Sequence, residues 1–255
     1  MIGLHRDGAI ATITIDRQER RNALNGELCA SLTDCLTNLD SPLAVIITGA
    51  GTAFCAGADL VTRFGAGDGE GGATDTFRPS FEILLDAIAE FPAPVIAAIN
   101  GPAIGAGMQL AVACDLRIAA PDAKLAIPGG RLGILLSPAN IQRLAQLVGH
   151  GLARDFLLTG RQVTGREALQ LGLVQRIDED ALGAAQLLAE HIATLAPLTV
   201  QGHKRALNLV TTASGLCADE SQEIAEMERE AFASDDLAEG MAAFSEKRDP
   251  VFYGR

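Results

Sequence analysis

Two turns rich in small residues carry the most recognisable chemistry in this 255-residue sequence. The first spans residues 49–60 (GAGTAFCAGADL) and the second residues 100–110 (NGPAIGAGMQL). Small side chains let a ligand approach backbone N–H groups, and the start of a helix adds partial positive charge. Two N–H groups aimed at one point form an oxyanion hole, which stabilises an enolate or a tetrahedral oxyanion. On spacing alone, tight turns packed into a core are an equally good interpretation.

The segments around the two turns predict the elements that hold them. Each turn follows a continuous apolar run, at residues 43–48 and 95–99, which is typical of a fully buried strand. We also expect a half-buried strand at 10–15, short strands at 115–119 and 125–127, helices that begin near Asn25-Gly26, Ser80 and Ala106, and mostly helix after Pro138. Strands alternate with helices in the first half, and helices dominate the end. This order predicts an α/β protein with a helical C-terminal region.

Charge and cysteine usage exclude several classes of partner. The net charge is −12, so the chain is a poor candidate for binding nucleic acid and should be repelled by anionic membrane surfaces. The N-terminus has no apolar signal segment. An odd, scattered set of five cysteines without a C-x-x-C pair indicates free thiols in a reducing compartment, at Cys29, Cys35, Cys55, Cys114 and Cys217. We therefore expect a cytoplasmic protein.

Other readings of the sequence are weaker. Residues 91–114 carry no charge, but prolines and polar residues interrupt them, so a buried strand, turn and helix fit better than a membrane span. The glycines at residues 49–51 lack the third glycine of a dinucleotide fingerprint. The four histidines form no metal-binding pair, and we expect no metal and no bound cofactor. The glycine-rich segment 65–72 is expected to be mobile.

These motifs resemble those of the enoyl-CoA hydratase/isomerase (crotonase) family. Residues 21–25 (RNALN) look like its first CoA-binding segment, residues 53–60 like its A-F-x-A-G-A-D-[IL] signature, and residues 100–115 like its second oxyanion loop. Further matches follow at residues 158–174 and at the C-terminal F-x-E-K-R of residues 244–248. The resemblance implies a crotonase (ClpP-like) fold, a spiral of β-β-α units over residues 1–195 with a helical trimerisation region at 196–255. It also implies a homo-oligomer, either a trimer or a dimer of trimers.

The resemblance implies an acyl-CoA as ligand and gives roles to individual residues. The backbone N–H groups of Ala58 and Ala106 would donate to the thioester oxygen. The remaining CoA contacts would come from Arg21 near the phosphates, from the backbone at Ala23 and Ala56, and from Asp59, Leu60, Phe244 and Lys247. An ordinary amphipathic terminal helix is the alternative for Phe244 and Lys247.

The sequence departs from the family at the two glutamates with which its hydratases hold and activate water. One should follow the glycine triplet by two residues, where this chain has Gln109, which cannot exchange a proton near neutral pH. The other should follow Pro128, where this chain has Gly129. Acid–base steps contribute roughly 10²–10⁴-fold each, so the loss of both should nearly abolish hydration. The oxyanion hole survives these changes because it uses only backbone N–H groups.

The interpretation that follows is an acyl-CoA-binding protein of fatty-acid metabolism with weak or no hydratase activity. It is similar to crotonase-like carriers of long-chain and mycolic-acid metabolism, on the pattern of residues 105–110. Residues 134–136 are apolar where other crotonases place an acid, which suits a long acyl chain. The alternative is a working hydratase, isomerase or thioesterase with an acid at another position, for which Asp68 and Glu70 are candidates. A third hypothesis is a scaffold that recruits fatty-acid synthesis enzymes.

Overall fold

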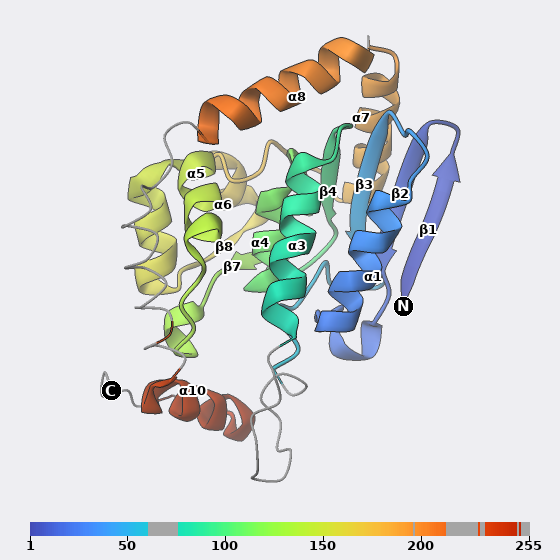
Figure 1. Ribbon diagram of the computed structural model, residues 1–255. Coiled ribbons are helices and arrows are strands. Elements are labelled where there is room, and N and C mark those ends of the chain that lie inside the picture. The colour runs from blue at the N-terminus through green and yellow to red at the C-terminus, as the bar shows by residue number, and fades with distance from the viewer. Residues whose placement is uncertain (61–75, 196, 213–228, 230–232, 249, 251–255) are drawn as a thin grey trace.

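A six-stranded sheet forms the centre of the computed structural model, which describes residues 1–60, 76–195, 197–212, 229, 233–248 and 250 (Figure 1). Its strands, in spatial order, are β1 (Ile2–Asp7), β2 (Ile10–Ile15), β3 (Ala44–Gly49), β4 (Val95–Ile99), β6 (Leu116–Ala119) and β9 (Arg176–Ile177). The β1–β2 hairpin is antiparallel, and every other neighbouring pair is parallel. This confirms the mixed α/β class and the strands predicted at residues 10–15 and 95–99.

The two faces of this sheet are covered by different helices, which explains the continuous apolar runs. Val45 and Ile47 share one cluster with α1 (Gly26–Thr37) and α3 (Phe77–Glu90). Their neighbours Ala44 and Ile46 point the other way and pack with α7 (Ala181–Ala193). All residues of β3 and β4 are buried because both faces are covered.

The structure also contains a second, three-stranded sheet, whose first strand follows β4 in the chain. It contains β5 (Ala103–Ile104), β7 (Lys124–Ala126) and β8 (Gln162–Thr164), in that order. Helices α4 (Ala106–Ala113), α5 (Pro138–Thr159) and α6 (Gly165–Gln170) belong to this half, along with the 3₁₀ turns η1 (Gln18–Arg20) and η2 (Gly129–Arg131). The short β8 and β9 interrupt the region after Pro138, which was predicted to be mostly helical.

The described C-terminal residues form two helices that lie far apart (Figure 1). Helix α8 (Pro197–Thr212) crosses one end of the molecule, and α10 (Asp235–Glu246) lies at the opposite end. The division at residue 195 remains a prediction. The glycine-rich segment at 65–72, with Asp68 and Glu70, lies outside the described residues. Within the described part of the chain, no helix is both long and apolar enough to cross a membrane.

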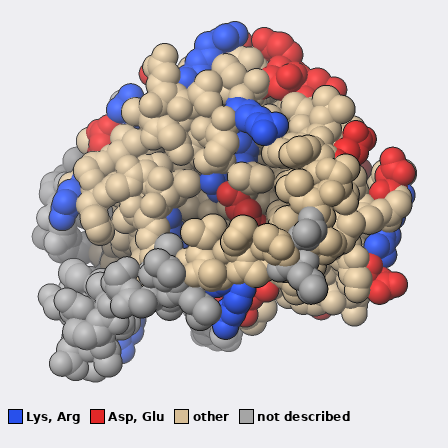
Figure 2. Space-filling model, turned by 90° about the horizontal axis from the view of Figure 1, so that it is seen from above, with Lys and Arg blue, Asp and Glu red and all other residues tan. Residues whose placement is uncertain are grey.

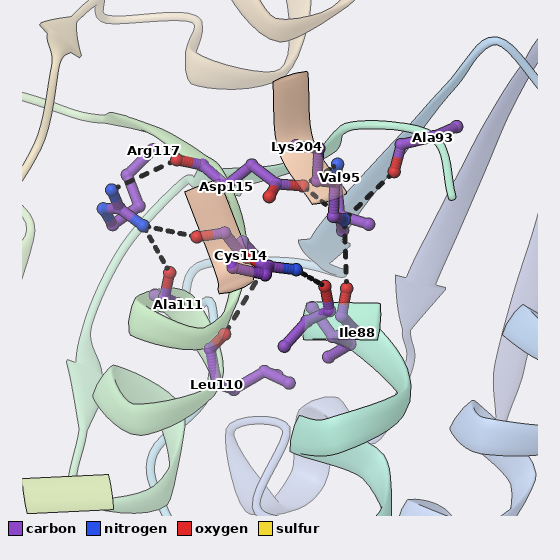
Figure 3. A network of polar contacts seen from close by, with 11 residues as sticks. Ile88, Ala93, Val95, Leu110, Ala111, Cys114, Asp115, Arg117 and Lys204 are labelled. Atoms are coloured by element: carbon purple, nitrogen blue, oxygen red, sulfur yellow. Dashed lines mark hydrogen bonds and ion pairs between the residues drawn. The ribbon is translucent and has the colours of Figure 1, made fainter. Parts of the chain in front are cut away.

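A buried lysine attaches α8 to the core (Figure 3). The Nζ atom of Lys204 donates to Asp115 Oδ2 at 2.7 Å and to the carbonyls of Ile88 at 3.2 Å and Ala93 at 3.1 Å. The same carboxylate oxygen accepts from the Val95 N–H at 2.7 Å. A single cation therefore joins α8 to the end of α3, to the start of β4 and to the segment after α4.

A buried arginine closes the C-terminal end of α4 (Figure 3). Arg117 Nη1 donates to the carbonyls of Cys114 at 2.6 Å and Ala111 at 3.2 Å, and its Nε donates to the Leu173 carbonyl at 2.9 Å. The last carbonyls of a helix lack intrahelical partners and carry partial negative charge. Arg117 satisfies them inside the core and fixes the helix that carries Ala106 and Gln109.

Candidate functional site

A buried asparagine organises the first of the two turns. Asn22 adopts a left-handed conformation with φ 59°, and its Nδ2 donates to the carbonyls of Ala50 at 2.9 Å and Ala53 at 2.7 Å. Its Oδ1 accepts from the Arg17 N–H at 2.9 Å. Asparagine tolerates this backbone region better than most residues. One side chain thus ties the segment before α1 to the turn at residues 49–54.

Backbone hydrogen bonds then place Ala58. The Leu24 N–H donates to the Gly57 carbonyl at 2.8 Å, and the Asp59 N–H donates to the Leu24 carbonyl at 2.7 Å. The Ala56 N–H donates to the Arg21 carbonyl at 3.0 Å. Both neighbours of Ala58 are therefore fixed, while its own N–H donates to no backbone carbonyl among the described residues.

Asp59 is buried and has a half-buried cationic partner. Its Oδ2 lies 2.7 Å from Arg17 Nη2, and Arg17 Nη1 also donates to the Ala23 carbonyl at 3.1 Å. Asp59 is 6% exposed, so this ion pair holds the turn together from beneath. The geometry gives this carboxylate a structural role beside the predicted ligand site.

The second turn packs directly on the first. The Cys55 N–H donates to the Pro102 carbonyl, and the Ile104 N–H donates to the Cys55 carbonyl, each at 3.0 Å. A side chain at Gly107 would place its Cβ only 2.1 Å from the Cys55 carbonyl oxygen, so only glycine fits. This close approach explains why the two turns themselves are so rich in small residues.

The residues that carry the two predicted oxyanion donors line a common pocket. Ala106 is the first residue of α4, where a backbone N–H has no acceptor within the helix. A Cβ built on Gly57 would lie 3.9 Å from the Ala106 nitrogen, which places the two turns side by side at this point. Ala58 and Ala106 both line the same pocket. Both residues therefore lie at the same pocket, and their role as an oxyanion hole of backbone N–H groups stays a prediction.

The pocket has a volume of about 530 Å³ and a predominantly apolar wall, in the size range of small-molecule sites. All residues predicted to contact CoA, to donate to the thioester oxygen or to replace a family glutamate line it, except Lys247. These residues are Arg21, Ala23, Ala56, Ala58, Asp59, Leu60, Ala106, Gln109, Gly129 and Phe244. Lys247 is exposed in a left-handed conformation just after α10. Further lining residues that sequence reasoning did not single out are Glu19, Arg20, Phe77, Arg78, Phe81, Glu82, Arg131 and Asn140.

The positions of the two missing glutamates are both at the pocket wall. Gln109 lies in α4, and its amide cannot exchange protons as a carboxylate does. Gly129 begins the η2 turn, and its carbonyl accepts from the N–H groups of Leu132 and Ile134. A Cβ at Gly129 would lie 2.6 Å from the Ile134 carbonyl oxygen. The local backbone therefore occupies the space where a side chain would begin.

A carboxylate that sequence reasoning missed enters the pocket from α3. Glu82 Oε1 accepts from Asn140 Nδ2 at 2.9 Å. Asn140 Oδ1 in turn accepts from Arg143 Nη1 at 2.8 Å, and Arg143 also forms an ion pair with Asp86. The only sequence signal for this network is the pair of acidic residues, Glu82 and Asp86, within the largely apolar residues 77–88.

The cysteine beneath the oxyanion hole has no nucleophilic role. Cys55 is fully buried, and burial raises the pKa of its thiol to about 12. Cys29, which lies close by in the same apolar cluster, has its pKa raised to about 12 for the same reason. Both thiols stay protonated near neutral pH, and a thiol is a weak nucleophile in that form.

Comparisons with known proteins agree with this geometry. A model of the enoyl-CoA hydratase/isomerase family matches residues 5–255. The probable enoyl-CoA hydratase echA6 of Mycobacterium tuberculosis is 43% identical, and the alignment covers 100% of both chains. The putative enoyl-CoA hydratase/isomerase YngF of Bacillus subtilis is 38% identical over 96% of this chain and 95% of its own.

Solved structures show the same arrangement of the chain. An enoyl-CoA hydratase/isomerase from Pseudoalteromonas atlantica superposes with a TM-score of 0.84 at 34% identity, covering 99% of each chain. A methylmalonyl-CoA decarboxylase in complex with 2-nitronate-propionyl-CoA superposes with a TM-score of 0.88 at 25% identity, covering 100% of this chain and 98% of its own.

Proposed function

Because this chain belongs to the enoyl-CoA hydratase/isomerase family, we propose that it binds acyl-CoA thioesters and that its capacity to hydrate their 2,3 double bond is weak or absent. One observation carries the proposal. The backbone donors of Ala58 and Ala106 share a pocket in which the two family glutamate positions hold Gln109 and Gly129. The groups that bind a thioester are kept, and the groups that move water's protons are not.

The charge pattern of the pocket supports a CoA ligand. Arg20, Arg21, Arg78 and Arg131 line it, although the whole chain has a net charge of −12. The phosphates of CoA are anionic, and guanidinium groups are well suited to bind them. The methylmalonyl-CoA decarboxylase neighbour was solved with a CoA thioester analogue, which agrees with this assignment.

The apolar part of the pocket favours a medium or long acyl chain. Phe77, Phe81, Leu132, Ile134 and Leu136 line it together. Burial of each methylene contributes roughly 0.8 kcal/mol, so affinity should rise with chain length until the pocket is full. We assign fatty acyl-CoAs as the ligand class on this ground.

We also propose that the protein forms a homo-oligomer, either a trimer or a dimer of trimers. The family resemblance motivates this proposal, and large apolar side chains on the surface support it. Leu158 at the end of α5 is 81% exposed and Phe244 on α10 is 56% exposed. Figure 2, which views the molecule from the α8 side, shows a broad uncharged area on that face. Light scattering coupled to size-exclusion chromatography tests this, and a monomer at micromolar concentration would contradict it.

The central experiment titrates the protein with trans-2-enoyl-CoAs from C4 to C16. Calorimetry follows binding, and the absorbance of the conjugated thioester follows hydration. We expect binding that tightens with chain length and no loss of absorbance above the uncatalysed rate. Turnover well above that rate would overturn the claim of impaired hydration, and no binding at any length would overturn the proposed ligand.

A matched pair of variants tests the oxyanion hole itself. Ala106→Pro removes one N–H at the first position of α4, where proline is well tolerated. We expect it to weaken acyl-CoA binding about tenfold, the value of one hydrogen bond, without changing the affinity for free CoA. Ala106→Gly keeps the N–H and should bind both ligands as the parent does. Equal losses for both ligands would place Ala106 away from the thioester.

A second candidate function has its own observation. Glu82 is a carboxylate in the pocket, so an active enzyme with an acid and base at an unusual position is the alternative. The same titration separates the two, because only an active enzyme changes the ligand.

A further inference from the structure

Three carboxylates among the described residues line the pocket, and they have different surroundings. Asp59 is held by Arg17 at 2.7 Å. Glu19 lies in the η1 turn beside Arg20 and Arg21, and its Oε1 is 3.7 Å from Arg17 Nε. Glu82 instead lies on α3, where Phe77 and Phe81 line the pocket beside it. It is therefore the carboxylate of the apolar part of the pocket.

The orientation of Glu82 is set by a buried amide. Asn140 is 4% exposed, and Arg143 donates to its Oδ1 at 2.8 Å. Because a guanidinium group can only donate, the amide oxygen must face Arg143 and the NH₂ must face Glu82. The Asn140 Nδ2–Glu82 Oε1 distance is 2.9 Å. One carboxylate oxygen is thus occupied by a fixed donor, which positions the glutamate without neutralising it.

The start of α5 supplies the scaffold for this contact. Ser137 caps the helix, with its Oγ 3.4 Å from the Asn140 N–H, and Pro138 fills the first helical position. Asn140 therefore lies in the first turn of α5, in the helical stretch that precedes the kink at Gly149. This turn holds the amide that contacts Glu82.

We propose that Glu82 is a catalytic acid and base that transfers a proton at the carbon chain of the bound thioester. The reaction class is the redox-neutral shift of a double bond from the 3,4 to the 2,3 position of an enoyl-CoA. This inference rests on the proposed function, since it requires a thioester bound at Ala58 and Ala106. Asn140 and Arg143 are positioning residues that act through Glu82.

The proposed step balances without a co-reactant. The Glu82 carboxylate takes a proton from C2, the C2–H electron pair becomes a C1–C2 π bond, and the carbonyl π pair moves onto the thioester oxygen, which gives a dienolate that still has its C3–C4 double bond. The N–H groups of Ala58 and Ala106 stabilise that oxyanion. The protonated Glu82 then delivers the same proton to C4, and the double bond comes to rest between C2 and C3.

Hydration makes greater demands than the described residues at these two family positions meet. Water addition needs groups that hold the water, remove one of its protons and protonate C2. Gln109 and Gly129 stand at the family positions for that work, and neither can transfer a proton. A double-bond shift needs only one carboxylate and an oxyanion hole. The observed set of groups fits the simpler reaction.

The test supplies the protein with trans-3-hexenoyl-CoA and trans-3-decenoyl-CoA and follows the appearance of conjugated thioester absorbance. A parallel incubation with a saturated acyl-CoA in D₂O follows deuterium uptake at C2 by mass spectrometry. We expect both reactions with the unaltered protein. Glu82→Gln should lower the isomerisation rate by about 10²-fold or more, the usual contribution of a general acid–base group, with acyl-CoA affinity unchanged.

Two matched variants accompany this experiment. Glu82→Asp keeps the carboxylate and should recover part of the lost rate. Glu90→Gln makes the same chemical change at the exposed last residue of α3, away from the pocket, and should leave the rate as it was. Asn140→Ala should lower kcat with little change in KM, because it removes the support of Glu82 and leaves the thioester contacts in place.

The outcomes separate this inference from the proposed function. Acyl-CoA binding without isomerisation or deuterium uptake would overturn the role of Glu82 and leave the binding function intact. Isomerisation that persists at full rate in Glu82→Gln would also overturn it. Absence of acyl-CoA binding would remove the proposed function as well.

Discussion

The two walls of the pocket are built from different parts of the polypeptide. We call residues 53–58 and 103–109 the thioester wall, because the proposed donors to the thioester are its backbone N–H groups. We call residues 77–82 and 129–140 the acyl wall, and its proposed functional group is a side chain, Glu82. The first wall depends on small residues at fixed points, whereas the second depends on which side chains the helices present.

This difference explains how one wall can keep its chemistry while the other changes. A backbone donor survives any substitution that preserves the path of the chain, so Ala106 can replace the middle glycine of the family's triplet. A proton-transfer group is lost with one substitution, as at Gln109. Binding and catalysis in this fold therefore change by separate routes.

The thioester wall should break most severely at Gly107. In Gly107→Val the new Cβ would meet the Cys55 carbonyl oxygen at 2.1 Å, and that backbone cannot move without displacing Ala58. We expect a loss of about 3 kcal/mol or more of the free energy of unfolding, together with acyl-CoA binding. Urea denaturation and calorimetry measure the two effects. Gly130→Ala in the opposite wall meets no atom within 4 Å and should be neutral. A stable, binding-competent Gly107→Val would show that the walls do not differ in this way.

Asn22 should be the next most sensitive position. Asn22→Ala leaves the carbonyls of Ala50 and Ala53 without their donor and keeps a left-handed backbone that alanine disfavours. We expect the free energy of unfolding to fall by about 2–3 kcal/mol and acyl-CoA binding to weaken. Thermal unfolding with and without acyl-CoA measures both effects. Asn22→Asp keeps the acceptor and the backbone preference but loses the donor to both carbonyls, so it should lose about as much stability as alanine, and a much smaller loss would contradict the role of the amide donor.

The acyl wall should respond differently when the family glutamates are restored. Gly129→Glu places a Cβ 2.6 Å from the Ile134 carbonyl oxygen, which should cost about 1–3 kcal/mol through local overpacking. Gln109→Glu is nearly isosteric and should fold normally. We expect that the double variant does not hydrate trans-2-enoyl-CoAs, as followed by absorbance. Recovery of hydration would show that the η2 turn readily opens for the side chain.

The smallest effect concerns thiol reactivity. Burial raises the pKa of Cys55 and Cys114 to about 12, and it also raises the pKa of the partly buried Cys35. Because the thiolate is the reactive form, alkylation at pH 8 should label Cys35 first and leave Cys55 unlabelled. Mass spectrometry at successive times gives the order in which the cysteines are alkylated. A Cys217→Ser variant restricts the comparison to the four cysteines that the structure describes. Bound acyl-CoA should slow labelling of Cys55 further, and early labelling of Cys55 would mean that the thioester wall opens readily.

Local patterns predicted much of the fold and many of the residues that line the pocket. The apolar runs at 95–99 and 10–15 and the asparagine before α1 placed two strands and one helix, because those signals act over a few residues. The two turns rich in small residues were also recognisable in the sequence, because closely spaced glycine and alanine residues indicate that two backbones approach each other. Boundaries shifted by a few residues, as for α3, which begins at Phe77 rather than Ser80.

The acyl wall could not be predicted in the same way. Glu82 and Asn140 are 58 positions apart and meet only because the fold brings α3 close to the first turn of α5. In the sequence Glu82 is one charged residue on a helix, and such residues are usually solvated. Arg17 is equally inconspicuous, although it holds Asp59 beneath the first turn. Contacts between distant elements decide these roles, and no short pattern records them.

The lysine that attaches α8 also constrains the order in which the chain can fold. Lys204 bonds to groups 89, 111 and 116 positions earlier in the sequence. During synthesis the N-terminal part of a chain emerges first, and contacts across such long loops close late. The sheet and α3 can therefore assemble while the carboxylate of Asp115 and the carbonyl of Ile88 still lack their partner. A ribosome-bound chain that stops before residue 204 would contain all residues of the thioester wall. The Asp115 carboxylate and the carbonyls of Ile88 and Ala93 would still be exposed to water in that chain.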